Sequence, residues 1–406
     1  MAMYSTKFLL IQCAKNNLQR CFSSQKGQVT SLYEFHIKNG GKMVNFGGYQ
    51  LPVQYSDQSI VNSHIFTRKN ASIFDVSHML QTEIKGKHSI EYFETLCTAD
   101  IKGLEENSSV LTVFTNENGG ILDDLIVTKI NEEFLYVVSN AAMKQQDQEI
   151  MSRGLNSFQK RVNSASDIRI QFFHTLERTL IALQGPKAST ALQSITDLDL
   201  SKLYFMKTAV GSVANVQNCR ISRCGYTGED GFEISIPAER SENVVQTLLE
   251  NSDVKLAGLG ARDSLRLEAG LCLYGSDING ETTPVDAALT WLVAKKRRET
   301  KDFPGADKIV QQIKEGSKIK RVGITSSTGP PPRHGTIILS EDGQEIGEIT
   351  SGCPSPTLEI NVAMGYVPAK SSKVGTKVGL KIRGKQYNGI ITKMPFVKSN
   401  YYNKVN

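Results

Sequence analysis

The chain lacks a long hydrophobic run and a cluster of metal-ligand residues. Its best apolar stretch, residues 8–11, is interrupted by Gln12, whereas a bilayer-spanning helix needs about 20 apolar residues. The six histidines form neither an HxxxH nor an HxH pair, and the seven cysteines include no CxxC pair. These absences argue against a membrane protein, a metal centre and a disulfide framework. We interpret the cysteines as reduced thiols and expect no bound metal.

The first 33 residues also lack any acidic side chain, while Lys7, Lys15, Arg20 and Lys26 contribute four positive charges. This composition predicts a mitochondrial transit peptide over residues 1–25 and a location in the matrix, with cleavage after Phe22. A secretory signal would need a longer apolar core. Removal of three or four of these cations lowers the net charge of +6 to +3 or +2, so the basicity is a weak argument for nucleic-acid binding.

Helical and strand patterns interleave through the first 290 residues without strict alternation, which predicts an α+β arrangement. Beyond Lys320 the pattern changes to short β-rich runs separated by turn residues, which is typical of a small all-β domain. We therefore predict one region over residues 26–297, a basic connector over 298–319 and a C-terminal β domain over 320–406.

The segment 225–233, Gly-Tyr-Thr-Gly-Glu-Asp-Gly-Phe-Glu, has three glycines at three-residue spacing, and between them stand two acidic groups and an aromatic ring. Glycine permits close backbone approach and positive φ, and the strand behind Glu233 could fix the direction of its carboxylate. The composition therefore indicates a recognition loop. The alternative is a hairpin whose acids are only solvated.

Asp123 and Asp124 occupy one expected strand, residues 121–130. Successive side chains of a strand point to opposite faces, so one of the two carboxylates must lie among apolar neighbours, where an unused charge is costly. Periodicity does not decide which, because both faces carry apolar residues. An acid pair flanking a turn on an edge strand is the other interpretation.

Two further motifs carry little functional signal. Gly258-Leu-Gly-Ala-Arg-Asp263 begins like a dinucleotide fingerprint, but it has Asp where the last glycine should be. His78 is expected to be a buried, hydrogen-bonded group rather than a catalytic base.

Eight ordered runs carry a resemblance to a known family: GGKMVNFGGYQLPVQY (40–55), FDVSHM (74–79), NENGGILDDLIV (116–127), ALQGPKA (182–188), RCGYTGEDGFEIS (223–235), GLGARDSLRLEAGLCLYG (258–275), TSGCPSPTL (350–358) and KMPFVKSNYY (393–402). Together they resemble the aminomethyltransferase, or T-protein, family of the glycine cleavage system. The resemblance implies a folate-binding α+β fold of three domains in a ring (a cloverleaf). In this arrangement one α+β subdomain is inserted around residues 57–140, and the C-terminal domain is barrel-like.

The resemblance also implies roles for single residues. Asp124, the second acid of the pair, matches the family's catalytic aspartate. Glu233 matches the glutamate that reads the pterin of tetrahydrofolate, and one carboxylate can accept both adjacent N–H donors of a 2-amino-4-oxo-pterin.

Arg262 matches an arginine that could bind a folate carbonyl or glutamyl tail; its alternative is a structural ion pair with Glu268. Tyr226 and Tyr401 match aromatic positions that border the site, although Tyr402 could be confused with Tyr401.

The implied reaction transfers the methylene of an aminomethyl group, carried on the lipoyl arm of H-protein, to tetrahydrofolate. Its products are ammonia, 5,10-methylenetetrahydrofolate and the dihydrolipoyl carrier. The implied partners are H-protein and, loosely, the other glycine cleavage components, with neither nucleic acid nor membrane. Residues 295–298 could steer an acidic carrier or could be a solvated connector. The alternative function is a folate-binding iron–sulfur cluster assembly factor, whose Lys-Gly-Cys-Tyr-x-Gly-Gln-Glu type motif this sequence lacks.

Overall fold

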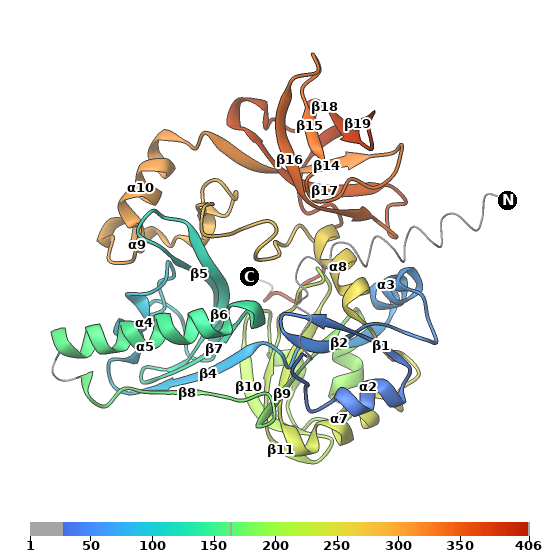
Figure 1. Cartoon of the computed structure of the whole chain (residues 1–406). Coiled ribbons are helices and arrows are strands. Elements are labelled where there is room, and N and C mark those ends of the chain that lie inside the picture. The colour runs from blue at the N-terminus through green and yellow to red at the C-terminus, as the bar shows by residue number, and fades with distance from the viewer. Residues whose placement is uncertain (1–26, 163–164, 405–406) are drawn as a thin grey trace.

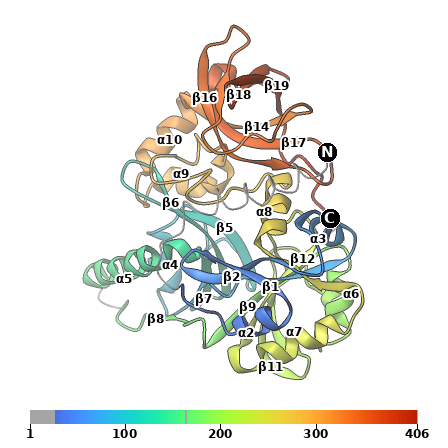
Figure 2. The same cartoon turned by 45° about the vertical axis from the view of Figure 1, so that its right-hand side comes forward.

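The computed structural model describes residues 27–162 and 165–404. Three lobes surround a shared centre, with the C-terminal lobe above two mixed lobes (Figures 1 and 2). The expected transit peptide lies outside the described residues. Among those residues, no helix has the length and apolar character needed to cross a membrane.

The first lobe contains a six-stranded sheet in the order β10-β11-β12-β9-β3-β13. Its strands are β3 (Ala71–Asp75), β9 (Arg178–Gln184), β10 (Thr208–Val213), β11 (Val216–Ser222), β12 (Gly231–Pro237) and β13 (Val254–Leu256). Its helices are α2 (Tyr33–Lys38), α3 (Ile60–Lys69), α6 (Ala188–Gln193), α7 (Ser241–Leu249) and α8 (Leu259–Glu268), and a separate ribbon pairs β1 (Gly41–Phe46) with β2 (Tyr49–Tyr55). Short 3-10 turns lie at Leu200–Lys202 and Ala238–Arg240.

Alternation along β12 assigns its side chains to two different layers. Phe232, Ile234 and Ile236 pack into a core shared with α2, α6 and α7. Glu233 therefore points to the opposite face, where Ala182, its partner on β9, packs in a second core with α8 and with β7 (Phe134–Ser139) of the next lobe.

The second lobe contains a five-stranded antiparallel sheet in the order β5-β6-β7-β4-β8. Its elements are β4 (Leu80–Lys85), α4 (Ser89–Glu94), β5 (Ser108–Thr115), β6 (Ile121–Asn131), β7 (Phe134–Ser139), a 3-10 turn (Ala141–Met143), α5 (Lys144–Arg161) and β8 (Arg169–Phe172). The second sheet thus spans residues 80–172, later than the expected insertion around 57–140, because β3 belongs to the first sheet.

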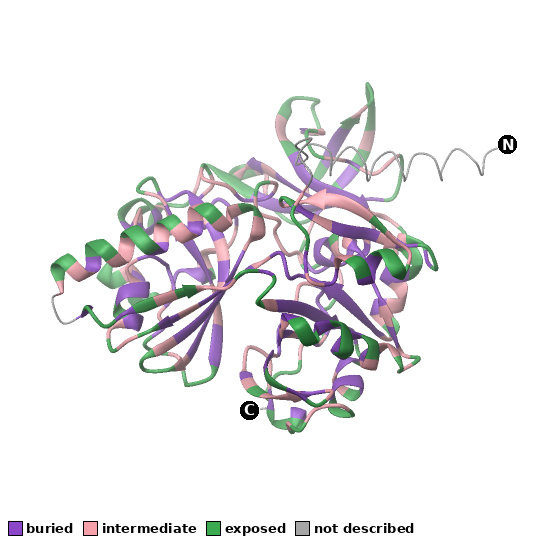
Figure 3. Ribbon diagram, turned by 60° about the horizontal axis from the view of Figure 1, so that its bottom comes forward, coloured by how far each residue is buried: buried purple, intermediate pink, exposed green. Residues whose placement is uncertain are grey.

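Helices α4 and α5 cover one face of this second sheet. Leu125 and Val127 of β6 point toward them and pack against Met151 and Phe158 of α5. Figure 3 shows burial alternating along α5, whereas the strands beneath it are largely buried. Asp123 shares the face of Leu125 and is fully buried, while Asp124 shares the opposite face with Ile126.

The connector and the third lobe complete the chain. A 3-10 turn (Thr290–Leu292) precedes two helices, α9 (Lys295–Thr300) and α10 (Ala306–Glu315). A closed barrel follows in the order β14-β17-β16-β15-β18-β19, with a 3-10 turn at Ala369–Ser371. Its strands are β14 (Ile319–Ser326), β15 (Ile337–Leu339), β16 (Glu345–Pro354), β17 (Asn361–Pro368), β18 (Lys377–Ile382) and β19 (Lys385–Thr392).

The α+β class and the C-terminal barrel are confirmed. The sequence patterns missed β17, which contains Gly365 and ends on Pro368, residues that weaken a strand signal. The five cysteines within the described residues are free thiols, as expected.

Candidate active site in the central cavity

A cavity of about 3110 Å³ lies between the three lobes and is lined by all of them. The five residues expected at the site line this one cavity: Asp124, Tyr226, Glu233, Arg262 and Tyr401. They come from β6, the loop before β12, β12, α8 and the C-terminal segment. The fold therefore brings together side chains separated by up to 277 positions in the sequence (401 minus 124).

Asp124 is the cavity-facing member of the acid pair. Burial first, and then the neighbouring Asp123, raise the pKa of Asp124 to about 7, while the Asn140 amide opposes the shift. Asn140 Nδ2 donates to Asp124 Oδ1 at 2.9 Å and to Asp123 Oδ1 at 2.9 Å. The Asp124 carboxyl is thus oriented by a single amide and can exchange a proton near neutral pH.

Glu233 and Arg262 are half-buried groups whose charges are not directly paired. Burial raises the pKa of Glu233, and Arg262 and the Cys224 thiol oppose the shift. Within residues 27–162 and 165–404, no salt bridge reaches either side chain, and Arg262 Nη1 is buried without a hydrogen-bond partner. The guanidinium carbon of Arg262 lies 4.9 Å from the centre of the Tyr226 ring. A carboxylate and an unsatisfied donor are therefore available to a ligand.

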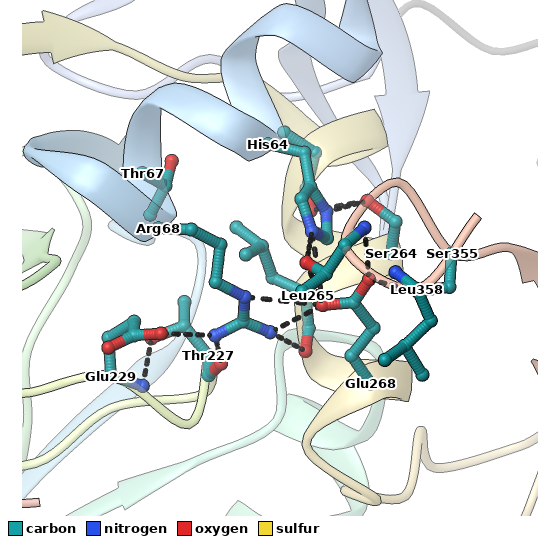
Figure 4. A network of polar contacts seen from close by, with 12 residues as sticks. His64, Thr67, Arg68, Thr227, Glu229, Ser264, Leu265, Glu268, Ser355 and Leu358 are labelled. Carbon is teal, nitrogen blue, oxygen red and sulfur yellow. Dashed lines mark hydrogen bonds and ion pairs between the residues drawn. The ribbon is translucent and has the colours of Figure 1, made fainter. Parts of the chain in front are cut away.

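The expected alternative for Arg262, an ion pair with Glu268, is wrong. Glu268 is bound instead by Arg68, whose Nη2 lies 2.9 Å from Glu268 Oε2, and by His64 at 3.1 Å (Figure 4). Ser355 and Thr357 of the barrel also donate to this carboxylate, at 2.5 and 2.8 Å. The network fastens the end of α8 to the third lobe and so holds the helix that carries Arg262.

The two tyrosines near the C-terminus have different surroundings. Tyr401 stacks on Phe205 with ring centres 4.2 Å apart and lines the cavity. Tyr402 is exposed, and it stacks on Tyr204 beneath the Arg223 guanidinium. Tyr401 is therefore the better placed of the two to border a ligand.

The glycine-rich loop contributes Gly225, Tyr226 and Glu233 to the cavity wall, and its glycines and loop acids also have structural partners. A Cβ at Gly225 would lie 1.8 Å from Gln184 Oε1, and one at Gly231 would lie 2.4 Å from the Leu183 carbonyl oxygen. These glycines are therefore needed for close packing against β9. The two loop acids are also structural, because Glu229 pairs with Arg68 at 2.9 Å and Asp230 pairs with Arg223 at 2.5 Å. They are paired groups, and neither is simply solvated.

Sequence reasoning missed polar groups behind the cavity. Asn140 follows β7 and looks like a turn residue, and Asp147 in the first turn of α5 looks like an ordinary acid at a helix start.

His78 is buried as expected, but its Nδ1 lacks a hydrogen-bond partner in the part of the chain that the structure describes. Burial lowers the pKa of His78 to about 3, so the imidazole is neutral. No cluster of three His, Cys, Asp or Glu residues suited to a metal ion occurs among the described residues.

Residues 295–298 are only partly free to meet a partner. Arg297 is buried and its Nη1 lies 2.6 Å from Asp302 Oδ1. Arg298 donates to the Val293 and Thr290 carbonyl oxygens at 2.9 and 3.0 Å. Two of the four cations therefore hold α9 in place, and only the two lysines are exposed.

Comparison with known proteins gives concordant matches. The family description "GCVT N-terminal domain" matches residues 32–297, and "Glycine cleavage T-protein C-terminal barrel domain" matches residues 320–398. A Canis lupus familiaris protein named "Aminomethyltransferase, mitochondrial" is 52% identical over 92% of this chain and 91% of its own length. A Solanum tuberosum protein of the same name is 49% identical over 97% of this chain and 96% of its own length.

A solved structure agrees with these sequence matches. The glycine cleavage system aminomethyltransferase T from Bartonella henselae superposes with a TM-score of 0.86 at 37% identity. The match covers 93% of this chain and 99% of that one.

Proposed function

The chain belongs to the glycine cleavage T-protein family and is a tetrahydrofolate-dependent aminomethyltransferase, and we propose that its reaction takes place in the central cavity. The carrier substrate in this proposal is lipoylated H-protein, whose aminomethyl group supplies the methylene. Ammonia, 5,10-methylenetetrahydrofolate and dihydrolipoyl H-protein are the products. The relatives are named mitochondrial, and together with the acid-free N-terminal composition this supports a location in the matrix.

The polar groups of the cavity suit a reduced folate. Glu233 offers a carboxylate that two adjacent pterin N–H groups can share, and Arg262 Nη1 offers a buried donor for a carbonyl or carboxylate oxygen. The rings of Tyr226 and Tyr401 add apolar surface to the wall of the same cavity. A ligand that leaves such buried groups unpaired would lose affinity, so these residues favour a pterin over an apolar ligand.

Tetrahydrofolate supplies the nitrogen nucleophile that captures the methylene, and Asp124 supplies the charge and proton handling. With a pKa of about 7, Asp124 is partly ionised at neutral pH. Its carboxylate can stabilise positive charge on the transferred carbon and can accept a proton from the attacking nitrogen. Asn140 holds the Asp124 oxygen in one direction, so little reorganisation is needed when charge develops.

One observation carries the proposal: Asp124, Glu233 and Arg262, from three different elements, line a single cavity. The test mixes the purified protein with aminomethylated lipoyl carrier and follows ammonia release with and without tetrahydrofolate. We expect rapid release that depends on the folate. Equal rates in the two mixtures would contradict the proposal.

A further inference from the structure

Three carboxyl groups lie together at the cavity wall, with Asp124 on the cavity side and Asp123 and Asp147 behind it. Asp123 and Asp124 are adjacent on β6, and Asp147 projects from α5 toward the same face of the sheet as Asp123. Asp123 and Asp147 are fully buried. Helix α5 buries Asp147, Met151 and Phe158 at helical spacing, so the Asp147 carboxyl points into the packed layer.

This cluster has too few donors for three negative charges. Asn140 gives two hydrogen bonds to Asp123, from Nδ2 at 2.9 Å and from its backbone N–H at 3.0 Å, and one from Nδ2 to Asp124. Neither Asp147 oxygen meets the geometry of a hydrogen bond from a donor among the described residues, and no salt bridge there reaches any of the three acids. Burial raises the pKa of Asp147, and its contacts with the Asp123 carboxyl and the Ser139 hydroxyl oppose the shift. Two buried carboxyl groups in contact cannot both ionise at modest cost, and a shared proton removes the conflict.

Resting on the function proposed above, we propose that Asp123 and Asp147 share one proton. Asp123 is protonated and donates to the Asp147 carboxylate. Asp123 then acts as a neutral positioning residue that leaves Asp124 as the carboxylate free to ionise toward the cavity. Burial, followed by repulsion from Asp147, raises the pKa of Asp123, in the direction that this assignment requires.

The other titratable groups around the cluster do not supply a positive charge that would compensate the carboxylates. Tyr226, Tyr274 and Cys272 are influenced by these acids, and burial raises the pKa of each, so all three stay protonated. Lys144, which precedes Asp147 by one turn of α5, donates to the Tyr49 hydroxyl at 2.9 Å. The proton balance is therefore set within the acid cluster itself.

The first test is the pH dependence of kcat/KM for folate-dependent ammonia release in Asp123→Asn. The wild-type rate should rise with pH as Asp124 ionises, with a midpoint above the ordinary value of an aspartate because burial raises the pKa of Asp124. Asn replaces a neutral acid by a neutral amide, so the midpoint should stay within about 0.3 pH unit of the wild type. The rate itself should fall about threefold to tenfold, because an amide nitrogen cannot accept one of the Asn140 hydrogen bonds.

An ionised Asp123 would give a different result. Its replacement would remove a negative charge beside Asp124, and the midpoint would move to lower pH by about one unit or more. That shift would overturn the inference. Glu149→Gln is the matched control, because this exposed acid lies two residues after Asp147 on α5 and pairs with Arg153.

The second test is independent of activity. A carboxyl whose pKa is raised by folding contributes stability at low pH and loses it as pH rises. Asp147→Asn removes the repulsion from Asp147 and offers an amide donor to an ionised Asp123, so the pKa of Asp123 should fall. The Tm of Asp147→Asn minus that of the wild type should therefore increase from pH 5 to pH 8. Glu149→Gln should show no such trend, and a flat difference for Asp147→Asn would refute the shared proton. If ammonia release does not depend on folate, the proposed function fails, whereas this Tm comparison still decides the proton sharing.

Discussion

Replacing Glu268 by Gln should destabilise the folded chain by about 3 kcal/mol near pH 7.5. Two independent estimates give this value. Burial opposes ionisation of this carboxyl, but the contact with His64, the hydrogen bond from Ser355 and the Arg68 charge outweigh it and lower the pKa from 4.5 to about 2. At 1.36 kcal/mol per pKa unit, that difference corresponds to about 3 kcal/mol. Breaking a buried ion pair by removing one partner costs about 3–5 kcal/mol. The low end of this range applies here because Arg68 would still be paired with Glu229 after the substitution.

The pH dependence of this effect has a definite sign. Because folding lowers the pKa of Glu268, its contribution is fully present above the unfolded value of 4.5 and is lost as pH falls from there toward about 2. Urea unfolding of the wild type and Glu268→Gln should therefore show a difference that is constant from pH 6 to pH 8 and shrinks below pH 4.5.

A matched control separates this network from ordinary surface charge. Glu345 forms an exposed pair with Lys381 at 3.1 Å, and Glu345→Gln should cost less than about 1 kcal/mol. If Glu268→Gln costs no more than Glu345→Gln, the network does not fasten α8 to the barrel.

Two further substitutions test the site and the connector. Glu233→Ala should weaken folate binding measured by calorimetry by about tenfold to 100-fold, because two pterin donors lose their acceptor. Exposed Glu239→Ala serves as its control; equal affinities would rule out pterin recognition by Glu233. Arg297→Ala should cost about 1–3 kcal/mol of unfolding free energy, since it removes a buried side chain and leaves the part-buried Glu94 carbonyl oxygen without its donor. Exposed Lys295→Ala should cost less than about 0.5 kcal/mol, and equal losses would mean that Arg297 does not anchor α9.

The acid pair on β6 shows what strand periodicity can and cannot predict. Alternation required one carboxylate to lie among apolar neighbours, and the structure places Asp123 there. The choice between the two acids depended on which face α5 covers, and that is a tertiary fact. The face of β6 that carries Asp124 also carries the apolar Ile126, because this face lines a cavity and not open solvent. Both faces of the strand therefore looked apolar in the sequence.

The glycine-rich loop shows a different limit. Its composition indicated a recognition loop, but Gly225 and Gly231 are also required by close packing against Gln184 and Leu183 of β9, about 40 residues earlier. The loop acid Glu229 is paired with Arg68, and no local pattern connects residues that far apart. The proposed role of Asp147 likewise depends on Asp123, which lies across the packed layer between α5 and β6. Local chemistry identified candidate groups, whereas their roles depended on long-range contacts.

The most direct test of the account is Asp124→Asn, measured for both turnover and tetrahydrofolate affinity. The amide keeps the size of the side chain but cannot carry the charge or accept the proton. We predict a loss of about 10²- to 10⁴-fold in folate-dependent ammonia release. Folate affinity measured by calorimetry should stay within about threefold, because Glu233 and Arg262 are unchanged. Turnover within threefold of the wild type would contradict the role of Asp124 in the reaction.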